Sequence, residues 1–250
     1  MKYNLKDTTF LIITRLDTIE RLENILAVTS FILKNFETNI HLWESSGYCN
    51  GFLRVLLDSH IQYSFIQDDD PIFHRTKYIN RMMEEVATSY VSVWDTDVIA
   101  PPQQIIDTVN LLRNGKADFV YPYEKLFLET SLILRKIFLT NGCDLQVLIR
   151  NKKRMNLLYM PIPVGGAFFC NVDSYQRSGL ENENFYGWGI EDGERYTRWI
   201  KKGFLVKRIS GPLFHLTHPR GINSTMHHKD QHIIKRKILN LAANAQMTHL

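Results

Sequence analysis

The chain has 250 residues, the size of one globular domain, and hydrophobic residues make up 44% of it, enough for a large core. Its 30 basic and 26 acidic residues leave a net charge of +4, which is too small to indicate a nucleic-acid-binding protein. Such a balance suits an anionic ligand, for example a nucleotide diphosphate, or an anionic lipid surface.

The first hundred residues predict strands and helices in alternation. Short apolar runs rich in β-branched residues are typical of buried strands, and apolar residues spaced three and four apart are typical of helices. This alternation indicates an α/β fold with a largely parallel sheet. The predicted strands are residues 9–14, 39–44, 61–66 and 91–94, and the predicted helices are residues 17–35, 50–59 and 75–90.

The rest of the chain is less regular. Pro101 and Pro102 suit the start of a helix, and Gly203 suits the end of one. We expect one domain over residues 1–228, followed by a basic helix or tail over residues 229–250. The predicted helices are residues 101–114, 126–139, 194–202 and 233–243, the predicted strands are residues 118–121, 167–170 and 204–209, and residues 211–221 are predicted to form a loop.

Polar side chains follow several of the predicted strands. Arg15 and Asp17 follow the first strand, Glu44 ends the second, and Asp95-Thr96-Asp97 follows the fourth. In parallel sheets, ligands bind at the carboxyl ends of the strands. We therefore expect these side chains to gather at one edge of the sheet.

Asp95 and Asp97 lie two residues apart, so an extended backbone places both carboxylates on one face. Two convergent carboxylates without cysteine suit a hard cation such as Mg²⁺ or Mn²⁺, with phosphate oxygens completing the shell. An aspartate-rich turn that caps the helix after Pro101 is the alternative.

Residues 184–194 (NFYGWGIEDGE) combine glycines, an aromatic ring and carboxylates. The glycines allow a sharp turn and the close approach of a ligand. Trp188 offers an apolar face of the kind that packs on a sugar ring, and Glu191 and Asp192 offer carboxylates that hold hydroxyls or accept a proton. The same acids, with Glu194, also suit the first turn of a helix, where the helix dipole stabilises negative charge.

His215 and His218 place two imidazoles three residues apart. Imidazole beside carboxylate favours Mn²⁺, Zn²⁺ or Fe²⁺ over Mg²⁺. The chain contains nine histidines, so a polar surface loop with a chance pair is the alternative.

The cysteines and the apolar runs predict where the protein resides. Cys49, Cys143 and Cys170 show no disulfide or zinc pattern, which is typical of a reducing compartment. The apolar run 10–13 is too short for a signal sequence, and no stretch reaches about 18 uninterrupted apolar residues. We expect a cytoplasmic protein, either soluble or peripheral to the inner membrane.

Five motifs in consistent order, between about residues 9 and 225, resemble the glycosyltransferases of the GT-A fold. Asp95-Thr96-Asp97 resembles their DxD motif, and 187–192 (GWGIED) is similar to the GWGxED signature of β-1,4-galactosyltransferases and chondroitin-polymerase-like bacterial enzymes. Residues 73–80 (FHRTKYIN) resemble the galactosyltransferase segment FNRAKLLN. The pair Gly165-Gly166 resembles the glycine-pair strand before the signature, and 215–223 (HLTHPRGIN) resembles the histidine loop after it.

The resemblance implies a GT-A fold, with a mostly parallel central sheet flanked by helices, and a role for each matching residue. Asp97 matches the metal-ligating carboxylate and His215 the metal-ligand histidine, with His218 as the alternative. The positions that hold the nucleotide correspond to Arg15, Glu44, Arg75 and Asp95.

On the sugar side, the resemblance implies that Trp188 and Glu191 contact the sugars and that Asp192 is the catalytic base. Backbone amides near Gly165 and Gly166 are expected to add hydrogen bonds to the substrate.

The implied activity is metal-dependent transfer of a sugar, Gal, GalNAc or similar, from a UDP-sugar to a hydroxyl of a glycan or lipid-linked glycan, with Mn²⁺ or Mg²⁺ as cofactor. Galactosyltransferases have an acid where Gly193 stands, and they are Golgi-membrane proteins with disulfides, so the bacterial branch and surface polysaccharide synthesis fit better. Asp192 after Glu191 favours inversion, although a related branch with a Trp-Gly-Gly-Glu segment retains configuration.

Two other function classes are the alternatives. A nucleotidyltransferase usually carries a glycine-rich loop with Arg and Lys after its first strand, but residues 14–17 read TRLD. A non-catalytic carbohydrate-binding protein on the same fold would not need the intact acids at positions 95, 97, 191 and 192.

The C-terminal stretch alternates basic and large apolar residues. This pattern predicts a helix that suits an anionic membrane surface, and it suits a packing helix or a dimer contact at least as well. The basic residues are Lys229, Lys235, Arg236 and Lys237, beside Ile233, Ile234, Ile238 and Leu241.

Overall fold

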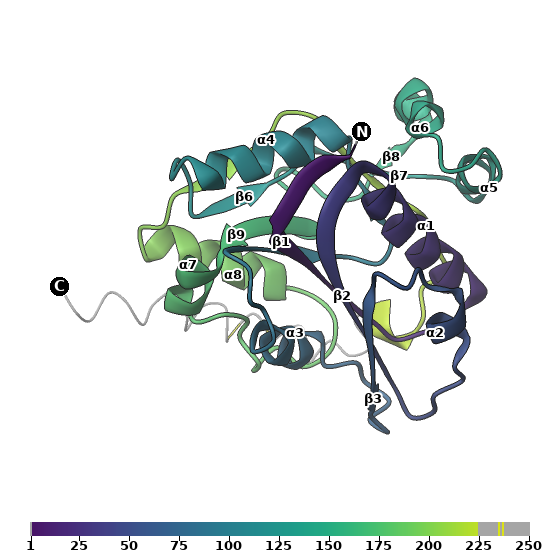
Figure 1. Cartoon of the computed structure of the whole chain (residues 1–250), viewed down its shortest axis with the longest axis horizontal. Coiled ribbons are helices and arrows are strands. Elements are labelled where there is room, and N and C mark those ends of the chain that lie inside the picture. The colour runs from purple at the N-terminus through teal and green to yellow at the C-terminus, as the bar shows by residue number, and fades with distance from the viewer. Residues whose placement is uncertain (1, 225–234, 236, 238–250) are drawn as a thin grey trace.

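The computed structural model describes residues 2–224 together with Lys235 and Lys237. Within these residues, a seven-stranded sheet forms the centre of the molecule and helices flank it (Figure 1). Its strand order is β10-β6-β9-β4-β1-β2-β3, and a smaller sheet has the order β5-β11-β7-β8. The predicted C-terminal helix lies outside the described residues, except for Lys235 and Lys237.

The first half of the chain confirms the predicted alternation. Four neighbouring strands run parallel, and helices connect them in sequence. The strands are β1 (Tyr3–Thr14), β2 (Phe36–Ser46), β3 (Gln62–Gln67) and β4 (Tyr90–Trp94), and the helices are α1 (Ile19–Asn35), α2 (Phe52–Leu56) and α3 (Arg75–Met83).

The bounds of α1 agree well with the prediction, because the side chain of Thr18 caps the helix by accepting a hydrogen bond from the amide of Arg21. The helix predicted over 75–90 ends earlier than expected. The amides of Glu84, Glu85 and Val86 bond to carbonyls three residues back, so the last turn tightens and the chain enters β4.

One antiparallel strand places the glycine pair at the end of β4. β9 (Ala167–Asn171) lies between β4 and β6 (Phe119–Tyr121), with Ala167 opposite Trp94. The amide of Asp95 then donates to the carbonyl of Gly166 at 2.9 Å. Two motifs about 70 residues apart in the chain therefore meet at one sheet edge. α4 (Pro102–Arg113) precedes β6, and β10 (Val206–Arg208) runs parallel to it.

The smaller sheet corrects two predictions. Residues 126–129 form strand β7 (Leu126–Glu129) rather than the start of a helix, because their backbone groups pair with β8 (Asn156–Leu157) and β11 (Pro212–His215). The predicted loop over 211–221 contains strand β11, which pairs with β5 (Val98–Ile99) directly after the Asp-x-Asp motif.

Several helices follow that the sequence pattern did not predict or placed elsewhere. The helix predicted over 126–139 begins only at Leu132, where Ser131 caps it, and the helix predicted over 194–202 begins at Glu191. The elements are α5 (Leu132–Thr140), α6 (Leu145–Asn151), the 3-10 helix η1 (Lys152–Arg154), α7 (Val172–Ser178), α8 (Glu191–Lys201) and the 3-10 helix η2 (Ile222–Ser224).

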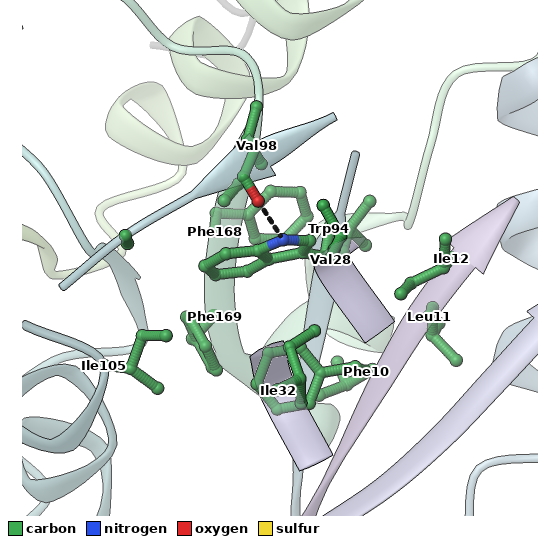
Figure 2. Packing of buried hydrophobic residues seen from close by; sticks show 14 of the residues in the cluster. Phe10, Leu11, Ile12, Val28, Ile32, Trp94, Val98, Ile105, Phe168 and Phe169 are labelled. Atoms are coloured by element: carbon green, nitrogen blue, oxygen red, sulfur yellow. Dashed lines mark hydrogen bonds between the residues drawn. The ribbon is translucent and has the colours of Figure 1, made fainter. Parts of the chain in front are cut away.

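The hydrophobic core includes Trp94 and Val98, the residues on either side of the Asp-x-Asp motif (Figure 2). The buried ring of Trp94 meets Phe10 and Phe169 edge to face, with ring centroids 5.5 and 5.8 Å apart. Its indole N–H donates to the carbonyl of Val98 at 3.0 Å. This bond spans the loop that carries Asp95 and Asp97, so the core fixes both ends of the motif.

None of the described helices combines the length and apolar character that are needed to cross a bilayer.

Candidate active site

A pocket of about 400 Å³ opens where β1 and β4 end and where α8 begins. Eleven of the twelve residues that the sequence singled out line this pocket, so the predicted gathering of the motifs at one edge is found. They are Arg15, Arg75, Asp95, Asp97, Gly165, Gly166, Trp188, Glu191, Asp192, His215 and His218.

Glu44 is the predicted residue that does not line the pocket. It is fully buried, and its carboxylate accepts a hydrogen bond from the hydroxyl of Tyr63 at 2.7 Å. Arg15, by contrast, reaches the pocket, and its guanidinium is held by the Asp68 carboxylate at 2.8 Å and by the Ser45 carbonyl at 3.0 Å.

Among the described residues, Asp97, His215 and His218 offer three ligand atoms that all lie within 4.8 Å of one another. His218 Nε2 lies 3.1 Å from one Asp97 oxygen, and His215 Nε2 lies 3.6 Å from the other. Both predicted histidines thus face the same carboxylate. The pairing of β11 with β5 produces this arrangement, since the amide of Leu216 donates to the carbonyl of Asp97 at 2.7 Å.

A second carboxylate orients His215. Glu129 Oε1 lies 3.5 Å from His215 Nδ1, so Nε2 is left to point at Asp97. Metal-binding histidines commonly face a carboxylate in this way with their other ring nitrogen. One carboxylate oxygen and two imidazole nitrogens form a donor set that suits Mn²⁺, Zn²⁺ or Fe²⁺.

The opposite charges of Asp97 and His215 shift each other's pKa values. Burial alone would raise the pKa of Asp97, but His215 and His218 lower it below its usual value. Burial alone would lower the pKa of His215, but Asp97 and Glu129 raise it. Each shift favours the charged form of its group, because Asp97 and His215 face each other with opposite charges.

The other aspartate of the motif has a different partner. Asp95 pairs with the guanidinium of Arg75 at 2.5 Å, and Arg75 is the first residue of α3. The two aspartates of the motif therefore have different partners: Asp97 belongs to the metal-ligand cluster, and Asp95 forms an ion pair with Arg75.

The glycine pair is required by close approach. A Cβ at Gly165 would lie 2.7 Å from Asp192 Oδ2. A Cβ at Gly166 would lie 2.7 Å from Leu213, and its φ of +84° favours glycine. Gly165 therefore lets the chain pass close beneath Asp192 in the first turn of α8, and Gly166 lets it pass close to Leu213 of β11 just before β9 begins.

Three left-handed residues shape the turn into α8. Gly187, Gly189 and Ile190 have φ values of 74°, 104° and 76°. A β-branched residue is rare in this region, so Ile190 marks a strained backbone. The turn exposes the first turn of α8, with Glu191 and Asp192, to the pocket. The alternative view of these acids as helix-start charges also holds, because they lie in the first turn.

Glu191 is only 7% exposed, and within the described part of the chain its Oε2 has no hydrogen-bond partner. Burial and the neighbouring charge of Asp192 raise its pKa to about 7. Lys235, itself buried, donates to the carbonyl of Trp188 at 2.6 Å, and its charge acts on Glu191.

Asp192 is held by a buried guanidinium. Arg195, one helical turn further along α8, donates to Asp192 Oδ1 at 2.6 Å and to the carbonyl of Val164 at 3.3 Å. Its other terminal nitrogen contacts both oxygens of Glu181 at 3.0 and 3.1 Å. The side chains of Arg195 and Glu181 are 2% and 1% exposed, whereas that of Asp192 is 31% exposed toward the pocket.

The comparisons with known proteins agree with this geometry. A family model described as the N-terminal domain of galactosyltransferase matches residues 151–224, which include the glycine pair, the α8 turn and both histidines. No curated protein sequence matches the chain. Similar solved structures include the catalytic domain of Drosophila β1,4-galactosyltransferase 7 in complex with xylobiose, with a TM-score of 0.58 and 15% identity over 94% of this chain and 79% of that one.

Two further structures share the fold. S. aureus TarS has a TM-score of 0.56 and 10% identity over 98% of this chain and 66% of its own. A mannosyltransferase from Pyrobaculum calidifontis, in complex with GDP-Man and Mn²⁺, has a TM-score of 0.54 and 12% identity over 98% of this chain and 64% of its own. The chain has the GT-A fold of these glycosyltransferases.

The pocket of this GT-A fold is also lined by residues that the sequence motifs did not single out: Arg21, Tyr159 and Arg220. Arg220 lies 3.5 Å from Glu129, and Arg21 bonds to Ser224. Arg220 stands inside the quoted histidine motif, so that motif carried a signal for it. Arg21 and Tyr159 reach the pocket only through the folding of α1 and of the loop after β8.

Proposed function

We propose that the protein transfers a sugar from a UDP-sugar to a hydroxyl of a glycan acceptor, with inversion at the anomeric carbon. The observation that carries this proposal is that one pocket holds both the cluster of Asp97, His215 and His218 and the anchored carboxylate of Asp192. A second structure of the Drosophila enzyme, a mutant, contains manganese, UDP-Gal and xylobiose, which supports both halves of this assignment.

Among the ions that the donor set suits, the manganese in two similar structures favours Mn²⁺ at the cluster, with Mg²⁺ as the second candidate. When bound there, the ion supplies positive charge that stabilises the leaving diphosphate. Asp97, His215 and His218 would hold it, and Glu129 would keep the His215 ring in the ligating orientation.

The nucleotide would lie along the ends of β1 and β4. Arg15 and Phe73 line the pocket together there, with the guanidinium 5.4 Å from the ring centroid. Arg75 and Asp95 are placed to bind the ribose and phosphate groups as an ion pair. Glu44 has no place in this proposal, because it lies outside the pocket lining.

The acceptor would lie against α8. Asp192 removes the proton from the acceptor hydroxyl while that oxygen forms a bond to the anomeric carbon, and the bond from that carbon to the diphosphate breaks. Trp188 provides a face for a sugar ring, and Glu191 accepts or donates a hydrogen bond to a sugar hydroxyl. Backbone amides near Gly165 and Gly166 are positioned for further hydrogen bonds.

The similarity of GWGIED to the signature of chondroitin-polymerase-like bacterial enzymes supports a role in bacterial surface polysaccharide synthesis, with a glycan or lipid-linked glycan as acceptor. The donor sugar would be Gal, GalNAc or a close relative.

The test begins with calorimetry of UDP binding with and without Mn²⁺, followed by UDP release from UDP-Gal, UDP-GalNAc, UDP-GlcNAc, UDP-Glc and UDP-GlcA. Asp192→Asn is expected to lower turnover roughly 10²–10⁴-fold, the usual contribution of a general base, with UDP affinity nearly unchanged. Asp173→Asn is the matched control, since Asp173 is an exposed acid in the first turn of another helix, α7. Near-normal turnover of Asp192→Asn, or a product with retained configuration, would refute the proposal.

A further inference from the structure

A helical excursion leaves the smaller sheet and returns to it at the same place. The chain departs after β7 and comes back as β8, and these strands pair, with Leu128 opposite Leu157. α5, α6 and η1 lie between them, and α5 and α6 sit together at one edge of the molecule (Figure 1).

The inner face of α5 is fixed to α1. Arg135 is 4% exposed, and it donates to Asn24 Oδ1 at 2.7 Å, to Glu23 Oε2 at 2.7 Å and to the Glu20 carbonyl at 3.0 Å. Phe138 is fully buried on the same side. Since these contacts set the orientation of α5, its outer face is also set.

That outer face is apolar and open to solvent. Leu132, Ile133 and Ile137 are 62%, 74% and 44% exposed, with Lys136 exposed beside them. Ile133 and Ile137 are four residues apart and therefore neighbours on one side of the helix. Exposure of three large apolar side chains on one short helix to water is unfavourable, and such a patch is typical of an interaction site.

The excursion continues with a basic turn. Within residues 131–162, all of which the structure describes, the exposed acid is Asp144, which caps α6. The exposed basic residues of the same range are Lys136, Arg150, Lys152, Lys153 and Arg154.

The returning chain extends this apolar character to the pocket. Leu157 and Met160 are 45% and 77% exposed, and Tyr159 and Ile162, also exposed, line the pocket itself. We call the exposed side chains of residues 132–162 the excursion surface. It includes the outer face of α5, and it reaches the pocket through Tyr159 and Ile162.

We propose that the excursion surface docks on an anionic lipid membrane. Exposed apolar side chains enter the interface between headgroups and acyl chains, and the basic residues meet the negative headgroups. The excess of five exposed basic residues over one acid selects an anionic surface over a neutral one. Docking in this way holds the mouth of the pocket at the bilayer.

A second apolar surface on α2 shows why charge decides the assignment. Tyr48, Phe52, Val55 and Leu56 are 77%, 62%, 82% and 52% exposed there. Their exposed charged neighbours within residues 48–58 are Arg54 and Asp58, which cancel. The α2 surface is therefore comparable in apolar exposure but has no basic excess, and it provides a matched control.

The test is co-sedimentation of the full chain with phosphatidylcholine vesicles that do or do not contain phosphatidylglycerol. The protein is expected to bind the mixed vesicles at least about tenfold more strongly and to be released by salt. Ile133→Ser with Ile137→Ser should weaken this binding, and Lys152→Gln with Lys153→Gln and Arg154→Gln should abolish the preference for anionic lipid. The controls Val55→Ser with Leu56→Ser, and Lys116→Gln with Lys207→Gln, should bind like the wild type.

Three outcomes would overturn the proposal: no binding of the wild type to anionic vesicles, unchanged binding of the excursion variants, or loss of binding through glutamine variants of Lys229, Arg236 and Lys237 instead. A dimer in solution that Ile133→Ser with Ile137→Ser disrupts, without vesicle binding, would assign the surface to a second copy of the chain. UDP release on a soluble acceptor should be the same for all these variants, so the assay separates failed docking from failed catalysis.

Discussion

The carboxylate assigned as the base depends on one guanidinium. Arg195 contacts Asp192, Glu181 and the Val164 carbonyl simultaneously, and its own position is confined by the rings of Phe168 and Trp199. A carboxylate that rotates freely would spend less time in line with an acceptor hydroxyl, so we infer that Arg195 is a positioning residue.

Replacing Arg195 should therefore lower kcat more than it raises KM. Arg195→Met alone leaves the buried Glu181 carboxylate without its cationic partner, a change that typically costs about 3–5 kcal/mol, so the variant to use is Arg195→Met with Glu181→Gln. We expect kcat to fall roughly tenfold or more, with the KM of the donor within about twofold of the wild type.

Arg195→Lys is expected to restore part of kcat, since lysine keeps the charge but not the forked geometry. Arg198→Lys is the control, because Arg198 pairs with Glu194 on the same helix and lies outside the pocket lining. Equal falls in stability and kcat for the Arg195 and Arg198 variants would mean that the role is structural only.

At the scale of elements, pairings between distant strands build the site. β9 brings Gly165 and Gly166 to the end of β4, and β11 brings His215 to Asp97 through only two residue pairs with β5. The sequence pattern predicted the four parallel strands, because each contains a run rich in apolar residues. It missed β7 and β11, since a short apolar run also suits a helix and the strands that pair with these two lie far along the chain.

The contact between Gly165 and Asp192 yields an element-scale prediction. Gly165→Ala places a methyl carbon 2.7 Å from Asp192 Oδ2, so the carboxylate must move. We expect turnover in the UDP-release assay to fall about tenfold or more, because a misplaced catalytic group is costly.

Gly193→Ala provides the matched control on the same helix. A Cβ at Gly193 meets nothing within 4 Å, and alanine favours a helix by about 1 kcal/mol over glycine. This variant should keep its turnover and melt slightly higher than the wild type. Loss of turnover in both variants would show that the effect comes from the α8 turn in general.

On the scale of the whole molecule, the sequence motifs predicted where the pocket lies, but they did not predict all of the residues around it. Eleven residues chosen for their chemistry line one cavity, since carboxylates, imidazoles and glycines in fixed patterns signal a site directly. Tyr159 and Lys235 carried no such pattern, and only packing shows them at the pocket or its α8 turn. Of the excursion between β7 and β8, the sequence predicted most of α5 within the helix over 126–139, but it missed β7 and α6.

The pocket also couples stability to pH through Glu191. Its folded pKa is about 7, above its usual value of 4.5. Between these values the unfolded chain releases a proton that the folded protein retains, so stability falls as pH rises. Above pH 7 both states are ionised and the full penalty, on the order of 3 kcal/mol, is constant.

Glu191→Gln removes this penalty, because glutamine does not ionise. The melting temperature of the variant minus that of the wild type, measured by calorimetry without ligands, should be smallest near pH 4.5, rise toward pH 7 and then level off. For a domain of this size each kcal/mol corresponds to about 2–4 °C. The control Glu84→Gln, at an exposed site, should show no such trend. A flat difference for Glu191→Gln across this range would mean that Glu191 is already ionised in the folded pocket, and the hydrogen bonds it offers to a sugar would then be those of an acceptor only.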